Sequence, residues 1–210
     1  RSSHPVPVTR RADPVTRMVV ESITHEDVSS PFVSVDYSLP FRRRGTEAGE
    51  RAVLLDSFVA DLLQEHLDEQ VRVGRLSIIR PYSTTFHHTS TQPFLGFNFV
   101  AEDPPRAVEA FLSELRGLAY HGFKPSVVKR LREDYDRYLD QQFLELPTLQ
   151  DYERATVLVE HFLFGRSAEE PEAQVNRHRS ILDTLTADVV NRWFAEVVEE
   201  SAPLVVVVGD

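Results

Sequence analysis

The fold of this 210-residue chain is decided by the stretch Pro93-Phe-Leu-Gly-Phe-Asn-Phe-Val-Ala-Glu-Asp-Pro-Pro105 and by the two amphipathic runs that follow it. Leu95, Phe97 and Phe99 alternate with other residues, which is the two-residue period of a strand whose two faces differ. The paired prolines then end the strand, and Pro105 suits the first turn of a helix. The stretch therefore predicts a strand that leads directly into a helix.

Two helices are predicted between Pro105 and Pro147. Apolar residues recur at three- and four-residue steps up to Gly122, which closes the first helix, and again after Ser126, a candidate N-cap. The two apolar stripes contain Val108, Phe111, Leu112, Leu115 and Leu118, and then Val127, Leu131, Tyr135, Tyr138, Leu139 and Leu146. A strand followed by two helices that each need cover predicts an open sheet with helices laid on it.

The rest of the chain supplies further strands and helices. Strands are expected at 18–23, 32–39, 75–86 and 204–208, a long helix from Thr46, and three more helices between Thr148 and the last strand. Pro81 cannot donate a backbone hydrogen bond, so part of the third strand is expected to be an edge or a bulge. A polar loop, 87–92, is expected to follow it. The apolar run at 204–208 is typical of a strand covered on both faces.

We therefore predict an α+β fold, a two-layer sandwich with a mostly antiparallel sheet and helices on one face. Residues 1–16 are proline-rich and aperiodic, which predicts a linker or strap, and residues 17–210 are expected to form a single domain. The chain begins at Arg1 and its only methionine is Met18, so we expect it to be a piece of a longer protein.

Composition excludes several classes of function. The net charge of −10 argues against a nucleic-acid backbone or an anionic membrane surface as the main partner. No apolar run approaches the length that crosses a bilayer. The absence of cysteine excludes disulfides and thiolate metal sites.

Several segments together resemble the pitrilysin/insulinase family of zinc peptidases. They are Phe32-Val-Ser-Val-Asp-Tyr37, the strand pair 75–86 and 94–100, Pro105-Arg-Ala-Val-Glu-Ala-Phe-Leu-Ser-Glu-Leu115, Leu185-Thr-Ala-Asp-Val-Val-Asn-Arg-Trp-Phe194 and Leu204-Val-Val-Val-Val-Gly209. Their order and spacing, rather than any one segment, carry the resemblance. It implies the mitochondrial-processing-peptidase-like metallohydrolase fold, which large members of the family contain in several copies.

The family's catalytic copy binds zinc through an HxxEH motif, in which two histidines hold the metal and the glutamate activates water. The complete motif is absent here. His66-Leu-Asp-Glu69-Gln70 has glutamine at the second ligand, and Val157-Leu-Val-Glu160-His161 has lost the first histidine. A neutral amide or a valine cannot replace an imidazole on zinc, so we predict no catalytic residue and no metal ligand in this chain.

The family's partner half also offers the substrate an arginine and a tyrosine seven positions apart. The matching positions here are Asp68 and Arg75, so that pair is missing as well. Four other residues, Arg80, Tyr82, His87 and His88, are expected to face a substrate chamber, although an exposed sheet face and a solvated loop explain them equally well. His121 and His178 fall at helical positions and are expected to be partly buried packing residues.

The resemblance implies a non-catalytic domain, most naturally the second of its parent, that packs on a metal-bearing domain and helps to enclose a peptide chamber. Its expected partners are other domains of the parent chain and the peptide substrate, and zinc is expected in the parent's catalytic domain. A bacterial periplasmic location is favoured over a cytoplasmic one. The alternatives are a structural module in an assembly without proteolysis, and an independent peptidase that uses His66 and Glu69 or Glu160 and His161.

Overall fold

The structure is a computed structural model that describes residues 16–26, 28, 30–40, 45–88, 93–148, 151–164 and 167–209. For residues 80–83, 85–88, 153, 154 and 164 the description covers the backbone alone. The linker predicted over residues 1–16 lies outside the described residues, apart from Thr16.

Five strands form one sheet in the order β1-β5-β2-β4-β3. Their bounds are β1 Val19–Thr24, β2 Phe32–Ser38, β3 Ile79–His88, β4 Pro93–Val100 and β5 Leu204–Gly209. Three neighbouring pairs, β5 with β2, β2 with β4 and β4 with β3, are antiparallel, whereas β1 lies parallel to β5. The last strand in sequence therefore lies inside the sheet, between the first two.

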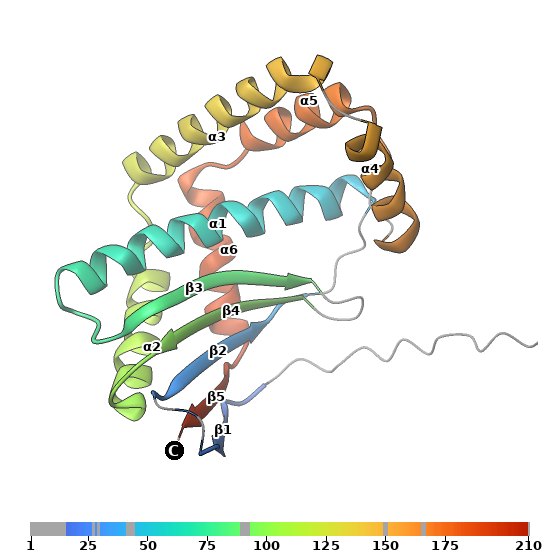
Figure 1. Ribbon diagram of the computed structural model, residues 1–210. Coiled ribbons are helices and arrows are strands. Elements are labelled where there is room, and N and C mark those ends of the chain that lie inside the picture. The colour runs from blue at the N-terminus through green and yellow to red at the C-terminus, as the bar shows by residue number, and fades with distance from the viewer. Residues whose placement is uncertain are drawn as a thin grey trace, which may run out of the picture.

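Six α-helices accompany the sheet among the described residues. They are α1 Glu47–Arg72, α2 Pro104–His121, α3 Pro125–Glu145, α4 Asp151–Phe164, α5 Pro171–Leu182 and α6 Ala187–Glu200, with the short 3-10 helix η1 Leu146–Thr148 between α3 and α4. Figure 1 shows α1 lying along the sheet, with α3 and α5 over α1 on the side away from the strands. The α+β class is confirmed, and α3 and α5 add an outer helical layer to the two layers that the sequence predicts.

The alternation predicted after Pro93 produces one buried face of the sheet. The inward side chains of the two paired strands are all buried: Val33, Val35 and Tyr37 of β2, and Leu95, Phe97 and Phe99 of β4. Phe111 of α2 packs its ring against Phe97 and Phe99 at centroid distances of 5.1 and 5.0 Å. Residues on the opposite face stay half-exposed: Ser34, Asp36 and Asn98. The helices thus cover one face of these two strands.

Local sequence signals begin and end several helices where they were expected. The Thr46 hydroxyl oxygen accepts a hydrogen bond from the backbone N–H of Gly49 at 3.1 Å and caps α1, as predicted. Gly122 ends α2 with a φ of 73°, a left-handed conformation that glycine adopts at little cost. The turn after Gly122 is tied to α6 by Asn191, whose side-chain amide bonds both backbone groups of Phe123.

The bulge predicted at Pro81 is confirmed, because the β3–β4 register shifts between Ile79 and Ser83. The prediction of a loop at 87–92 is wrong for its first two residues. His87 and His88 continue β3 and pair with Phe94 and Pro93. Hydrogen bonding to β4 thus extends the strand beyond the point at which its apolar pattern stops.

Three further expectations were wrong. Ser126 does not cap α3, because that helix starts at Pro125 after Lys124. The strand expected from Arg75 begins only at Ile79, because the N–H groups of Arg75 and Leu76 bond Gln70 in the turn that ends α1. In β5 only Val205 is buried, because helices cover one face of the sheet and not both.

Candidate functional site

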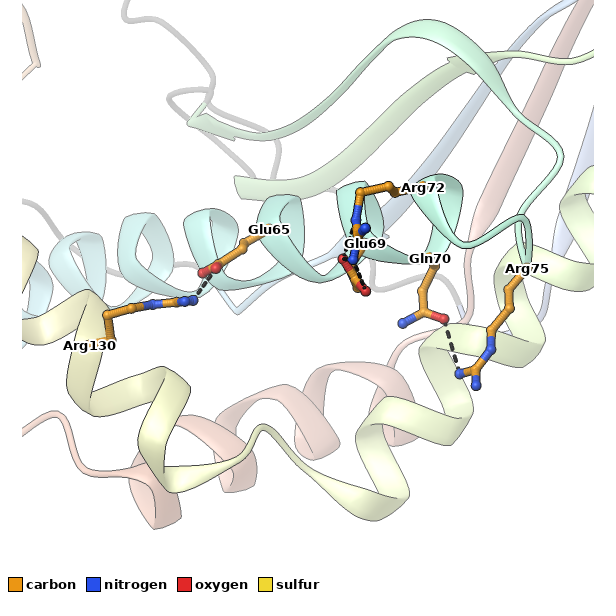
Figure 2. A network of polar contacts seen from close by, with 6 residues as sticks. All are labelled: Glu65, Glu69, Gln70, Arg72, Arg75 and Arg130. Carbon is orange, nitrogen blue, oxygen red and sulfur yellow. Dashed lines mark hydrogen bonds and ion pairs between the residues drawn. The ribbon is translucent and has the colours of Figure 1, made fainter.

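The C-terminal end of α1 carries the first incomplete metal motif, and its side chains are already engaged. His66 places its Nε2 atom 2.7 Å from Oε1 of Glu114 on α2, with about a quarter of each side chain exposed. Glu69 accepts two hydrogen bonds of 2.7 Å from Arg72, one helical turn later (Figure 2). The carboxylate that would activate water is therefore held by a guanidinium group on the surface of α1.

Gln70, at the position of the second histidine, belongs to the turn that ends α1. It is 6% exposed, and its backbone oxygen accepts bonds from the N–H groups of Arg75 and Leu76 at 2.9 and 3.3 Å. Gly74, with a φ of 75°, turns the chain back at this point. Figure 2 shows the Arg75 side chain reaching toward the Gln70 amide, where Nη1 lies 3.4 Å from Oε1.

These residues do not fit a zinc ion. A catalytic zinc needs three protein ligands, and an uncharged amide is a poor substitute for imidazole or carboxylate. The guanidinium of Arg75 places a positive charge beside the second ligand position, which repels a divalent cation. Across the described part of the chain, no group of three metal-ligating side chains comes together.

The second incomplete motif lies on α4, far from the first in sequence. Glu160 is half-buried and His161 is exposed, and Val157 stands one helical turn before His161, where the motif needs its first histidine. Among the described residues they form no group of three ligands with His66 or Glu69 of α1. The two incomplete motifs therefore do not combine into one site.

The four residues expected to face a chamber all belong to β3. Arg80, Tyr82, His87 and His88 lie on this edge strand, which pairs only with β4 among the described residues. Their side chains lie outside the described part of the structure. Their orientation toward a substrate stays a prediction.

An ion-pair network that sequence reasoning missed joins α5 to the start of α1. Arg177 on α5 donates through Nε to Glu169 at 2.9 Å, and its Nη1 lies 3.5 Å from Glu50 of α1. The Ser167 hydroxyl donates to the other oxygen of Glu169 at 2.7 Å. The bonds from Arg177 and Ser167 lower the pKa of Glu169 below its ordinary value. The network borders a cavity of about 320 Å³. Its lining consists of Glu50, Ser167, Glu169 and Arg177 together with Gly45, Thr46, Glu47, Ser180 and Ile181.

Histidines on α5 and α2 differ in burial. His178 is half-buried beside this network, as predicted, and burial lowers its pKa, with a further decrease from Arg177. His121 was expected to be partly buried but is exposed in the last turn of α2, with its ring against Tyr120. Glu169 precedes α5 in the chain and pairs with Arg177 of that helix.

Comparison with known proteins identifies the fold. No protein-family profile and no curated protein matches the sequence. The first half of the periplasmic protease PqqL from Escherichia coli superimposes with a TM-score of 0.79 at 14% identity, over 94% of this chain and 43% of that one. A predicted insulinase-family protease from Yersinia pestis gives a TM-score of 0.78 at 12% identity, over 99% of this chain and 45% of that one.

A third structure is described as the inactive peptidase domain of a putative zinc protease from Bordetella parapertussis. It superimposes with a TM-score of 0.59 at 15% identity, over 88% of this chain and 92% of that one. The chain therefore has the fold of insulinase-type zinc protease domains. It spans less than half the length of the PqqL and Yersinia chains.

Proposed function

We propose that this chain is a non-catalytic domain of a zinc metalloendopeptidase of the pitrilysin/insulinase family. It packs on the metal-bearing domain of its parent and helps to enclose the chamber that receives the peptide substrate. The fold shared with protease domains supports the family assignment, and the order of the sequence segments that resemble the family supports it independently.

The observation that carries the proposal is that the residues at the motif positions, near the end of α1, are already bonded to other side chains. Gln70 is buried and bonded to Arg75, Glu69 is held by Arg72, and His66 is engaged by Glu114. A working zinc site needs its glutamate close to a metal-bound water and its imidazoles turned toward the metal. Here the same positions serve the packing of α1 against α2 and against the following turn, so the zinc belongs elsewhere in the parent.

The substrate-facing surface is proposed to include β3. An edge strand presents unpaired backbone N–H and C=O groups along its outer side, and an extended peptide can pair with them. Arg80, Tyr82, His87 and His88 lie on this strand and are the side chains that we propose face the chamber. The proposed location is the bacterial periplasm, in line with the periplasmic PqqL. Among the described residues no helix is long and apolar enough to cross a membrane.

The test is zinc retention together with peptide hydrolysis by the purified chain. After exposure to zinc and exhaustive dialysis, we expect far less than one zinc per chain by elemental analysis, and no chelator-sensitive cleavage of an unstructured peptide. The variant His66→Ala/Glu69→Ala should give the same values as the wild type, because neither residue is a ligand. About one zinc per chain that this double variant abolishes would overturn the proposal and revive an independent peptidase.

A further inference from the structure

Helix α4 turns an apolar face outward. Five large apolar side chains on this helix are strongly exposed: Tyr152 at 66%, Leu158 at 64%, Val159 at 53%, Phe162 at 86% and Leu163 at 60%. We call these five residues the α4 face. A contiguous exposed apolar patch on a folded domain marks a surface that contacts something else.

Among the α4 residues whose side chains the structure describes, the half-buried pair combines an apolar residue and a charged one. Val157 and Glu160, one turn apart, are half-buried, whereas the aromatic ring of Phe162 lies almost entirely outside the fold. A surface helix of a free-standing domain places its apolar stripe against the core and its polar residues in water. The described side chains of α4 are instead largely apolar on the outward side, which is typical of a helix whose outer surface is covered in a larger assembly.

The α4 face continues onto the neighbouring end of α3. Phe143 and Leu144 in the last turn of α3 are exposed at 40% and 77%, and η1 connects them to α4. Figure 1 shows the end of α3, η1 and α4 gathered at one end of the molecule. In the described part of the chain, α4 has no extensive packing with another helix or strand. The surface is therefore uncovered along its length.

The size of the surface indicates what covers it. A helix of 14 residues is about 21 Å long and its exposed side is about 10 Å wide, so the α4 face offers a few hundred Å². A stable complex of separate proteins buries about 800 Å² on each partner. A second copy of this chain would also bring a like net charge of −10 to the contact. A small patch suits a tethered partner, because covalent linkage gives an effective concentration of about millimolar.

We infer that the α4 face, with the adjoining end of α3, is covered by an apolar surface of another domain in the same polypeptide. The inference rests on the proposed function, since it names the surface through which the domain packs on its neighbour. The length comparison agrees with it, because the PqqL and Yersinia chains contain more than twice the matched length. The partner surface is a groove of aliphatic and aromatic side chains that receives Phe162, the most exposed of the five residues.

The test is hydrogen–deuterium exchange of residues 151–164 in the parent polypeptide and in the isolated 210-residue chain. We expect exchange of this segment to be at least tenfold slower in the parent, while the core helix α2 exchanges alike in both. Equal exchange of 151–164 in the two proteins would overturn the inference, as would a parent that contains no further domain.

A pair of variants matched for exposure makes the test specific. Phe162 and Tyr120 are both 86% exposed, on α4 and α2 respectively. In the parent, Phe162→Ser should speed the exchange of 151–164 at least tenfold, whereas Tyr120→Ser should leave it unchanged. If both variants or neither changed the exchange of 151–164, the α4 face would not be the contact.

Other occupants give distinct results with the isolated chain. If residues 151–164 exchanged more slowly at higher protein concentration and light scattering gave a dimer mass, the surface would be assigned to a second copy. Slow exchange only with phosphatidylglycerol vesicles would assign it to lipid, and either result would overturn the inference. Failure here leaves zinc content unaffected, so it is distinguishable from failure of the proposed function, which appears as about one bound zinc per chain.

Discussion

Asn191 on α6 holds Phe123, the residue that follows the α2 terminus, through both ends of its side-chain amide. Its Oδ1 accepts a hydrogen bond from the Phe123 N–H at 2.7 Å, and its Nδ2 donates to the Phe123 backbone oxygen at 3.2 Å. Phe123 is itself buried, with its ring 5.9 Å from that of Phe194. The turn between α2 and α3 is therefore fixed to a helix that comes much later in sequence.

Replacing this residue should weaken the whole domain. Asn191→Ala leaves two backbone groups of Phe123 without their partner, so we expect the free energy of unfolding to fall by about 1–3 kcal/mol. Urea denaturation followed by circular dichroism measures the change. Asn191→Asp keeps the acceptor for the Phe123 N–H but places a carboxylate oxygen opposite the Phe123 backbone oxygen, so it should lower the free energy of unfolding as well. Equal stability of Asn191→Ala and the wild type would show that water replaces the amide at no cost.

Restoring the family motif at α1 should not restore metal binding. Gln70→His completes the HxxEH pattern at residues 66–70, but the positive charge of Arg75 remains beside the new ligand, and His66 is already engaged by Glu114. We expect no zinc to survive dialysis against a weak chelator. Gln70→Leu serves as the control for loss of the amide alone. Tightly held zinc in Gln70→His would mean that the site lacks only this one ligand.

The stability of the domain should fall in mild acid because of His178. Burial, and next the neighbouring Arg177, lower its pKa, although Glu50 and Glu169 act in the opposite direction. The unfolded chain therefore takes up this proton at a higher pH than the folded chain, and stability is lost as the pH falls below about 6.5. His178→Gln should reduce the pH dependence between about pH 7.5 and 5.5. The matched control is His121→Gln at an exposed position.

A second loss of stability should appear at lower pH, in the wild type and in His178→Gln alike. The pKa of Glu169 is lowered by its bonds to Arg177 and Ser167, so its contribution is complete above the unfolded pKa and disappears as the pH falls through the folded one. Urea denaturation at several pH values separates the two effects. A His178→Gln curve parallel to that of the wild type above about pH 5.5 would contradict the assignment to His178.

The contact between α1 and α3 should depend on one hydroxyl group. Tyr135 on α3 donates to Oδ2 of Asp61 on α1 at 2.6 Å, and its ring lies 5.3 Å from that of Phe58. Tyr135→Phe keeps the ring and removes the bond, so we expect a loss of about 1 kcal/mol in the free energy of unfolding. Tyr138→Phe on the same helix is the control, because its hydroxyl accepts from Gln142 within α3. Equal effects of the two changes would rule out a special role for Tyr135.

Local patterns in the sequence predict the parts of this fold that local physics decides. The alternation at Leu95, Phe97 and Phe99 and the start of α1 at Thr46 depend on neighbours in the chain, and the structure contains both. That the HxxEH motif at residues 66–70 is incomplete follows directly from the identity of Gln70. Such features can be predicted before any tertiary contact is known.

Features that depend on distant partners could not be predicted in this way. Nothing in the sequence near Arg177 indicates that it meets Glu50 on another helix, and nothing near Asn191 indicates its bonds to Phe123. The apolar run of β5 favoured cover on both faces, although only Val205 is buried, and the apolar residues of α4 are consistent with buried and exposed positions alike. Which side of each becomes buried is decided by the elements placed against it, and for β5 helices cover only one side.

The position of β5 between β1 and β2 also constrains how the domain can form. Val19 pairs with Leu204 and Val33 with Val207, so the middle of the sheet closes only after nearly the whole described chain has been synthesised. Until then β1 has no strand partner and β2 has a free edge, which exposes a template for pairing between chains on the ribosome. Contacts between residues so far apart in sequence also make folding slow. The edge of β2 that faces β5 is therefore covered only once the last strand emerges.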